Sequence, residues 1–186
     1  MRVTLQTLNQ LDLDLSSRAR LKSVRGFWWR PAVCLSHSGD SWLWAIGAAL
    51  VWAICRGHSP VWQRNAAVLE ISVVIQALLI FALKQVIHRT RPDGEWGGIY
   101  RNVDPHSFPS GHATRAAMLA VLALALGPAW FGWLILAWAP LVCLSRLMTG
   151  VHYLGDILGG VVSGILIGFL MLALVPVWVS QFPFLF

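Results

Sequence analysis

The sequence predicts an all-α, polytopic membrane bundle of five to six helices, preceded by an amphipathic helix that lies in the membrane interface. Of the 186 residues, 57% are hydrophobic and only 12% are charged, whereas an ordinary soluble domain carries about 25% charged residues. So few polar side chains would leave large apolar patches on a soluble protein of this size. Five apolar runs and eleven tryptophans clustered at their ends complete the pattern, because tryptophan gathers at both membrane interfaces.

The N-terminal 39 residues alternate polar and apolar positions, and four of the leucines share one helical face: Leu5, Leu8, Leu11 and Leu15. A group of basic residues follows, next to three consecutive aromatic residues. An amphipathic segment of this kind suits a helix that lies among lipid headgroups. We therefore expect residues 1–39 to form an interfacial segment that does not span the bilayer, and residues 40–186 to form one membrane-embedded domain.

The five apolar runs are Ser41–Cys55, Ala66–Leu83, Ala113–Leu126, Trp130–Leu144 and Ile157–Trp178. A spanning helix needs about 20 residues, which the second and fifth runs supply and the other three reach with their semi-polar flanks. Gly127 and Pro128 predict a tight turn between the third and fourth runs. In the fifth run, Gly160, Gly164 and Gly168 recur every four residues, which predicts a face where a neighbouring helix packs closely.

The net charge is +6, which by itself would fit nucleic acid, an anionic membrane surface or an anionic substrate. The basic residues lie in the first thirty positions and in three short segments between apolar runs, so nucleic acid is not expected as a partner. The three cysteines have no metal-ligand spacing. We interpret them as small hydrophobic residues.

The first of the three polar segments closes the second run with Lys84 and Arg91-Pro92. Seven residues are two helical turns, so both cations are expected on one helix face. Pro92 disfavours the helical conformation at Arg91, which ends the helix there. Two cations are thus predicted to converge at a helix end.

The second polar segment, Phe108-Pro109-Ser110-Gly111-His112, opens the third run. A helix N-terminus presents unpaired N–H groups and the positive end of the helix dipole, which together favour an anion. Gly111 allows a phosphate to approach the backbone, and the Ser110 hydroxyl adds a donor. His112 falls in the first turn of this helix.

The third segment, between the fourth and fifth runs, contains Ser145, Arg146, His152 and Asp156. If the fifth helix starts near Val151, His152 and Asp156 lie on one face, and the carboxylate can orient the imidazole. Arg146 brings a guanidinium whose fork matches phosphate oxygens. This combination predicts a base with its orienting acid.

Together the three segments resemble the three-part signature of the type 2 phosphatidic acid phosphatase superfamily, which also includes the vanadium haloperoxidases. Every signature position is matched in order, at the ends of apolar runs, and three motifs in register are a strong signal. The resemblance covers roughly residues 40–180. It implies that residues 40–186 form a membrane-embedded phosphatase domain.

The resemblance also implies a role for each matched residue. His152 would attack phosphorus and become a phosphohistidine, Asp156 would orient it, and His112 would protonate the leaving oxygen. The phosphate-binding set would be Lys84, Arg91, Ser110, the Gly111 amide and Arg146. With three fixed cations in place of Mg²⁺, no metal and no other cofactor is expected, and no further acidic cluster with hard-cation spacing remains in the sequence.

The expected reaction is therefore hydrolysis of a phosphate monoester or pyrophosphate on a membrane lipid. Short members that look like this one most often resemble polyprenyl diphosphate phosphatases, so undecaprenyl diphosphate of the cell envelope is the first expected substrate. Phosphatidylglycerol phosphate and phosphatidate are alternatives, and a lipid phosphotransferase would use the same residues. A haloperoxidase is disfavoured because those relatives are soluble, and a non-enzymatic lipid-phosphate transporter or scaffold is the alternative of a different class.

We expect a multi-pass protein of the cell (inner) membrane. Five spans place the three motifs on the same side as the basic N-terminus, which the positive-inside rule would assign to the cytoplasm. The bacterial relatives, by resemblance, face the periplasm, and three of the cations are required by catalysis. We therefore expect an extracytoplasmic active site.

Residues outside the three motifs also have predicted roles. The loop of residues 93–108 contains several glycines and Trp96, and we expect it to contact the headgroup as a mobile lid. His106 and Arg115 flank the second motif and are candidates for substrate contact. Asp40 is expected to cap the first span, and Glu70 to lie at the interface.

Overall fold

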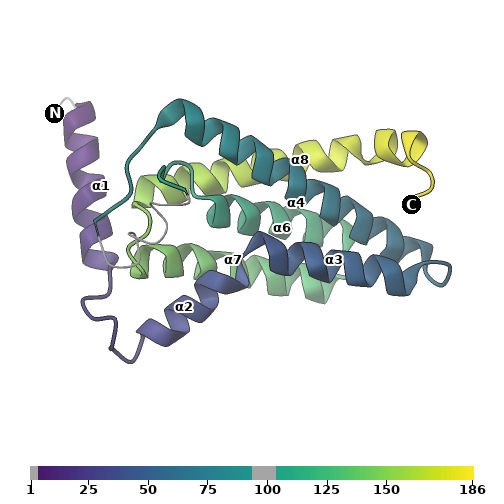
Figure 1. The fold of residues 1–186 in the computed structure, drawn as a ribbon, viewed down its shortest axis with the longest axis horizontal. Helices are drawn as coiled ribbons and strands as arrows, with labels where there is room; N and C mark the ends of the chain where they lie inside the picture. Colours follow the sequence, from purple (N-terminus) through teal and green to yellow (C-terminus); the bar gives the residue numbers. More distant parts are fainter. Residues whose placement is uncertain (1–3, 94–103) are drawn as a thin grey trace.

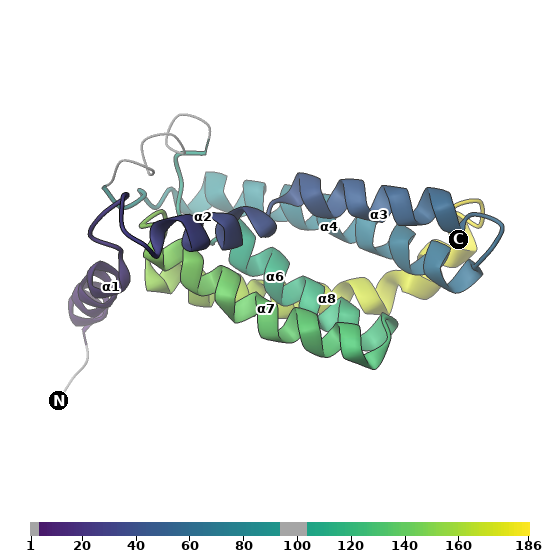
Figure 2. The same ribbon diagram turned by 90° about the horizontal axis from the view of Figure 1, so that it is seen from below.

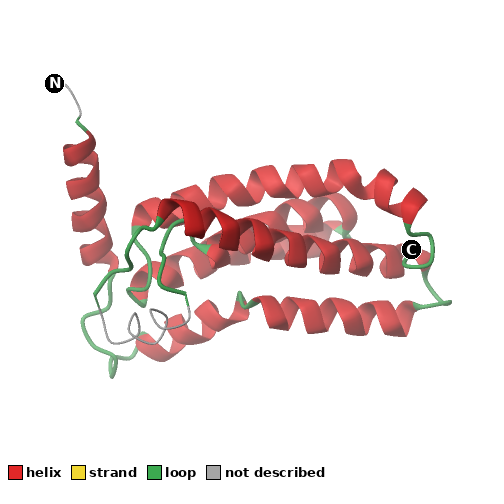
Figure 3. Cartoon of the chain, turned by 45° about the horizontal axis from the view of Figure 1, so that its top comes forward, coloured by secondary structure: helices red, strands yellow, loops and turns green. Residues whose placement is uncertain are grey.

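The computed structural model describes residues 4–93 and 104–186, which form helices and connecting segments. Seven α-helices are present in these ranges: α1 (Leu5–Ala19), α2 (Trp29–Ser38), α3 (Ser41–Cys55), α4 (Pro60–Ile87), α6 (Gly111–Leu126), α7 (Ala129–Met148) and α8 (Leu154–Gln181). Figure 1 shows α3, α4, α6, α7 and α8 running side by side, with α1 standing across one end of the bundle. The described residues contain no strand, as the secondary-structure colouring in Figure 3 shows. The predicted all-α membrane bundle is confirmed.

Three helices, α4, α7 and α8, are each long and apolar enough to cross a membrane. Helices α2 and α3 meet at a bend of 49° and form a fourth crossing if the pair is one span. Helix α6 is apolar but has only 16 residues. Each of the five predicted apolar runs therefore lies in one helix, α3, α4, α6, α7 or α8, although not all of these meet the length of a span alone.

Helix α6 is the centre of the bundle and packs against α7 and α8. Met118 and Leu122 of α6 pack with Ile80 of α4 and Ile167 of α8 in one buried cluster. On another side, α6 and α7 share a second buried cluster around Val142. Seen from below in Figure 2, α6 lies between the α3–α4 pair and the outer helices α7 and α8.

The three regularly spaced glycines of α8 lie against α6, as predicted. A Cβ at Gly160 would lie 2.8 Å from the Ser110 carbonyl oxygen, and one at Gly164 would lie 2.2 Å from that of Thr114. Both distances are shorter than van der Waals contact with backbone, so the two helices approach more closely than any side chain larger than glycine allows. We call this contact the glycine seam.

The N-terminal residues form two helices with different surroundings. Helix α2 packs against α7, whereas α1 contacts the first turn of α8 and the end of α7. Leu8 and Leu11 of α1 are about half exposed (51% and 53%). Its polar residue Ser16 is buried against the protein instead.

Replacing Gly164 by alanine is expected to lower the melting temperature of the detergent-solubilised protein, because overpacking a tight interface costs about 1–3 kcal/mol. The matched control is Gly47→Ala in α3, where nothing lies within 4 Å of the added Cβ. That variant should be as stable as the parent or slightly more so, because alanine favours a helix by roughly 1 kcal/mol over glycine. Equal melting temperatures for the two variants would contradict the glycine seam.

Candidate active site

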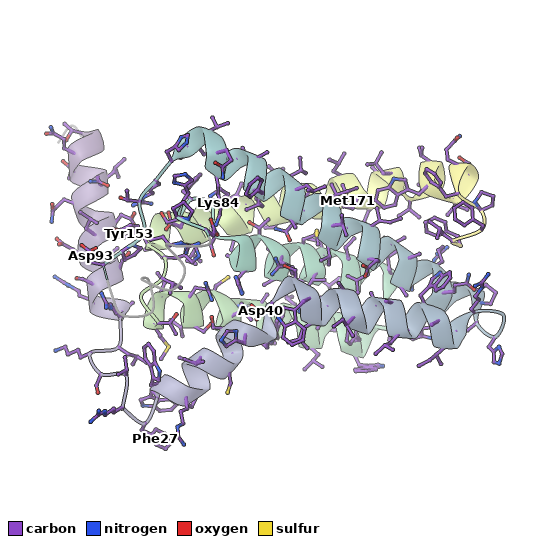
Figure 4. All side chains as sticks on the ribbon, viewed as in Figure 1. Phe27, Asp40, Lys84, Asp93, Tyr153 and Met171 are labelled. Carbon is purple, nitrogen blue, oxygen red and sulfur yellow. The ribbon has the colours of Figure 1, made fainter. Side chains whose placement is uncertain are left out.

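Buried polar side chains gather at the end of the bundle next to α1. Lys84, Arg91, Ser110, Arg146, His152 and Asp156 are all at least 96% buried. Figure 4 shows Lys84, Asp93 and Tyr153 at this end and Asp40 at the break between α2 and α3, whereas Met171 lies farther along the bundle. Polar groups in a membrane domain are costly, so such a concentration marks a functional site.

Lys84 and Arg91 converge as predicted, but not on one helix face. Helix α4 ends at Ile87, because His88 adopts the left-handed conformation with a φ of 51°. Arg91 therefore lies in the extended segment that follows. Lys84 Nζ donates to Asp104 Oδ2, and Arg91 Nη2 donates to the same oxygen at 2.7 Å.

His152 points its Nε2 atom toward these cations. Arg91 Nη1 lies 3.2 Å from His152 Nε2 and also donates to the Val151 carbonyl oxygen at 3.0 Å. A guanidinium can only donate, so this contact assigns the lone pair to Nε2 and the proton to Nδ1. The nitrogen that can act as a nucleophile thus faces the cationic cluster.

Asp156 lies on the opposite side of the His152 ring, with Oδ2 3.5 Å from Nδ1. Helix α8 begins at Leu154 and not near Val151, so the pair is not formed by helical spacing. Instead Asp156 sits in the first turn and reaches back to accept the Tyr153 backbone N–H at 2.9 Å. This capping contact turns the carboxylate toward His152.

Ser110 and Gly111 form the start of α6, where a phosphate was predicted to bind. Ser110 occupies the N-cap position, but its side chain makes no capping hydrogen bond. Its hydroxyl has no hydrogen-bond partner among the residues that the structure describes. The Ser110 backbone N–H donates to the Asp156 carbonyl oxygen at 3.0 Å, which joins the second and third motifs.

His112 is held by Asp40, a residue expected only to cap the first span. Asp40 Oδ1 lies 2.7 Å from His112 Nε2, and Asp40 Oδ2 lies 2.9 Å from His37 Nδ1. Asp40 does occupy the N-cap position of α3, but its side chain makes no capping hydrogen bond there. The predicted N-cap position is therefore right, but the bend between α2 and α3 turns the carboxylate toward α6 and away from the α3 N–H groups.

The same bend supplies partners for two buried arginines. Arg146 donates from Nη1 to the Ser36 hydroxyl of α2, and Arg115 donates to the Gly39 carbonyl oxygen. Arg115, a candidate for substrate contact, therefore supports the α2–α3 bend. His106, the other candidate, packs edge-on against His88 with ring centroids 4.6 Å apart.

Electrostatics keep the His152 imidazole neutral. Burial, followed by the charges of Arg146, Arg91 and Lys84, holds the pKa of His152 well below its ordinary value of 6.5. A neutral imidazole, which keeps a lone pair on Nε2, is the reactive form for attack on phosphorus. The same three cations would stabilise negative charge that develops on a phosphate.

A polar cavity of about 640 Å³ opens beside His152, between α1 and the start of α8. Its lining includes Arg20, Lys22, Asp93 and Tyr153. Residues 94–103 of the predicted headgroup loop lie outside the described residues. No group of three His, Cys, Asp or Glu side chains with the geometry of a metal site occurs in residues 4–93 and 104–186.

Four residues of the site were not identified in the sequence: Asp12, Ser36, Arg89 and Asp104. Each contacts a motif residue or its partner from a distant part of the chain. A lone carboxylate or hydroxyl without motif spacing gives no signal of such a contact. Of the four residues, only Arg89 carried a sequence signal, because it lies two positions before Arg91 in the first motif.

A membrane-embedded helical bundle with buried cations, two imidazoles and a carboxylate at one end defines a membrane phosphatase. The sequence profile of the PAP2 superfamily matches residues 65–180. The chain belongs to this superfamily, and like its relatives it is a phosphatase, so it is an enzyme and not a passive carrier.

Relatives of known activity share about a third of their residues with this chain. The decaprenylphosphoryl-5-phosphoribose phosphatase of Mycobacterium tuberculosis is 33% identical over 137 residues, which are 72% of this chain and 73% of the relative. The undecaprenyl-diphosphatase of Sulfolobus acidocaldarius is 32% identical over 142 residues, 74% of this chain and 66% of the relative.

Two solved structures have a similar fold. The PAP2-type phosphatidylglycerolphosphate phosphatase of Bacillus subtilis superimposes with a TM-score of 0.73 at 25% identity, covering 94% of this chain and 89% of that protein. LpxE of Aquifex aeolicus superimposes with a TM-score of 0.64 at 19% identity, covering 88% of this chain and 95% of that protein. The second likeness concerns the fold alone.

The Asp104 carboxylate forms ion pairs with Lys84 and Arg91, the cations predicted to bind phosphate. Replacing Asp104 by alanine is expected to lower the inhibition constant of inorganic phosphate about tenfold, because one competing negative charge is removed. Glu70→Ala is the control, since it makes the same change in net charge about four helical turns before Lys84 in α4. Weaker phosphate inhibition in Asp104→Ala would show instead that Asp104 orients the two cations for binding.

Proposed function

We propose that this protein hydrolyses a terminal phosphate from a polyprenyl-linked substrate through a phosphohistidine at His152, with undecaprenyl diphosphate as the preferred substrate. The observation that carries the proposal is the contact between Arg91 Nη1 and His152 Nε2. It supports a neutral imidazole whose lone pair faces the cations that would hold the phosphate.

In the first step, His152 Nε2 attacks phosphorus and the bond from phosphorus to the leaving oxygen breaks. Asp156, beside Nδ1, stabilises the positive charge that forms on the ring. His112 starts this step as the imidazolium, which the Asp40 carboxylate stabilises, and gives its Nδ1 proton to the leaving oxygen. Asp40, 2.7 Å from His112 Nε2, fixes the ring so that Nδ1 is the nitrogen that faces the substrate.

In the second step, water attacks the phosphohistidine and His112 takes one of its protons. The bond from phosphorus to Nε2 breaks. Inorganic phosphate leaves, and the His152 imidazole is regenerated. Lys84, Arg91, Arg146, the Ser110 hydroxyl and the Gly111 amide stabilise the negative charge in both steps. These cations supply the charge stabilisation, so the proposed reaction requires no metal.

A lipid tail has a place next to the site. An apolar cavity of about 460 Å³ lies between α3, α4, α6 and α7. Its lining includes Ser38, two residues before Asp40, and Gly127, at the far end of α6. A tail in this cavity would leave its phosphate near His112, which favours a lipid over a soluble phosphate ester.

A second candidate is a polyprenyl phosphate that carries a phosphorylated sugar. The polar cavity beside His152 is large for a diphosphate alone, and its lining has both basic residues (Arg20 and Lys22) and acidic ones (Asp14 and Asp93) that can hydrogen-bond a sugar. The mycobacterial relative acts, by its name, on a substrate of this type. Phosphatidylglycerol phosphate, the substrate in the name of the Bacillus protein, is the third candidate, with phosphatidate after it.

A substrate panel with purified protein tests these proposals. We expect the highest kcat/KM for undecaprenyl diphosphate, with decaprenylphosphoryl-5-phosphoribose second, and label from the terminal phosphate appearing as inorganic phosphate. His152→Ala should lower kcat by about 10³-fold or more, whereas His58→Ala, at the opposite end of the bundle, should not change it. EDTA should leave the activity intact.

Other results would each overturn a defined part of the proposal. Retained hydrolysis in His152→Ala would exclude the phosphohistidine. Label transferred to another lipid would identify a phosphotransferase. Activity lost in EDTA and restored by Mg²⁺ would exclude the metal-independent reaction.

We further propose that the enzyme lies in the cell (inner) membrane with its active site on the extracytoplasmic face. Residues 94–103 connect Asp93, which lines the cavity beside His152, with Asp104, which pairs with Lys84. The α3–α4 loop lies at the opposite end of the bundle (Figure 1). The chain between Asp93 and Asp104 and the α3–α4 loop therefore serve as the two reporter segments. Their accessibility distinguishes the two orientations.

Single cysteines at Gly98 and at exposed His58, in a protein without its native cysteines, test the orientation. In intact cells, an impermeant thiol reagent is expected to label the cysteine at position 98 and not the one at 58. The reverse pattern would place the active site in the cytoplasm, as the basic N-terminus alone would indicate.

A further inference from the structure

Helix α1 places two polar side chains on the first turn of α8. The Ser16 hydroxyl accepts the Leu154 backbone N–H at 2.8 Å, and Asp12 Oδ1 accepts the Gly155 N–H at 2.8 Å. These N–H groups belong to the start of a helix, where no carbonyl of the same helix can accept them. A distant segment thus caps the helix that carries Asp156.

The second oxygen of Asp12 makes a different contact. Asp12 Oδ2 accepts from Arg89 Nη2 at 2.5 Å, and Arg89 Nη1 donates to Asp156 Oδ1 at 2.8 Å. The guanidinium therefore lies between two carboxylates, one on each of its terminal nitrogens. Its carbon also lies 4.4 Å from the centre of the Tyr153 ring, which fixes the plane of the fork.

Asp156 depends on this arginine for its charge and its direction. Its side chain is fully buried, and a buried carboxylate requires a paired cation and satisfied hydrogen bonds. Arg89 binds Oδ1, while the Tyr153 N–H binds Oδ2. Together these contacts leave Oδ2 turned toward His152 Nδ1.

We propose that Asp12 is a positioning residue of the active site: through Arg89 it holds Asp156 in the orientation that directs His152 at the phosphate. This inference rests on the proposed role of His152 as the nucleophile. Helix α1 is then part of the catalytic apparatus, although it lies outside residues 65–180 that match the superfamily. The chain of contacts runs Asp12, Arg89, Asp156, His152.

A purely structural role for Asp12 predicts different behaviour, and Ser16 separates the two. Ser16 caps the neighbouring N–H from the same face of α1 and donates to Asp12 Oδ1 at 3.5 Å, whereas Arg89 binds the other oxygen, Oδ2. Asp12→Asn keeps an oxygen that can accept the Gly155 N–H and removes the charge that holds Arg89. Ser16→Ala removes a cap and leaves the Asp12–Arg89 pair in place.

The test compares kcat, KM and melting temperature for the full-length protein and these two variants on the best substrate of the panel. Asp12→Asn is expected to lower kcat about tenfold or more, because small displacements of catalytic groups are costly, with KM changed less than about twofold. Its melting temperature should stay close to that of the parent. Ser16→Ala should lower the melting temperature and keep kcat within about twofold.

A double-variant cycle checks that Asp12 acts through Arg89. If it does, Asp12→Asn added to Arg89→Gln lowers kcat no further than Arg89→Gln alone, since coupled residues are not additive. The proposal is overturned if Asp12→Asn keeps its kcat, if Ser16→Ala loses kcat to the same extent, or if the two effects multiply. Failure of the phosphohistidine proposal is a separate result, because it would appear as retained activity in His152→Ala.

Discussion

The close approach of α6 and α8 along the glycine seam fixes the relative position of the second and third motifs. Gly160 lies against the Ser110 carbonyl, and the Ser110 N–H donates to the Asp156 carbonyl. The first turn of each helix is therefore in direct backbone contact with the other. A side chain at the seam would separate the Ser110 hydroxyl from the His152–Asp156 pair. The active-site geometry thus depends on residues that have no chemistry of their own.

The second constraint is the cost of burying several cations in a membrane domain. The protein compensates with carboxylates and carbonyl oxygens from outside the motifs. Asp104 pairs with Lys84 and Arg91, and the Gly39 carbonyl accepts from Arg115. In the same way, the Asp40 carboxylate binds His112 Nε2. These partners come from the α2–α3 bend and the segment before α6, so the catalytic end of the bundle is assembled from most of the chain.

The sequence predicted the helical spans and the three motifs because both depend on local patterns: apolar runs, glycine spacing and short signatures. It predicted the convergence of Lys84 and Arg91 for the wrong geometric reason, since the left-handed His88 ends α4 before Arg91. It also placed the start of α8 too early, because the capping contact from Asp156 to Tyr153 was not foreseen. Asp12 and Asp104 carried no local pattern at all. Their roles arise from contacts with residues 77 and 20 positions away in the chain. Such long-range contacts cannot be predicted from local patterns in a single sequence.

The carboxylate on Lys84 and Arg91 has a consequence for selectivity among the lipids that surround the enzyme. Ordinary phospholipids are phosphodiesters with one negative charge on phosphorus, and they are present in vast excess over any lipid with a terminal phosphate. A ligand of this site must displace Asp104 from both cations. A terminal phosphate, with close to two charges near neutral pH, gains more from the exchange than a diester with one. The resting ion pair would thus act as an electrostatic threshold that keeps the bulk bilayer out of the site.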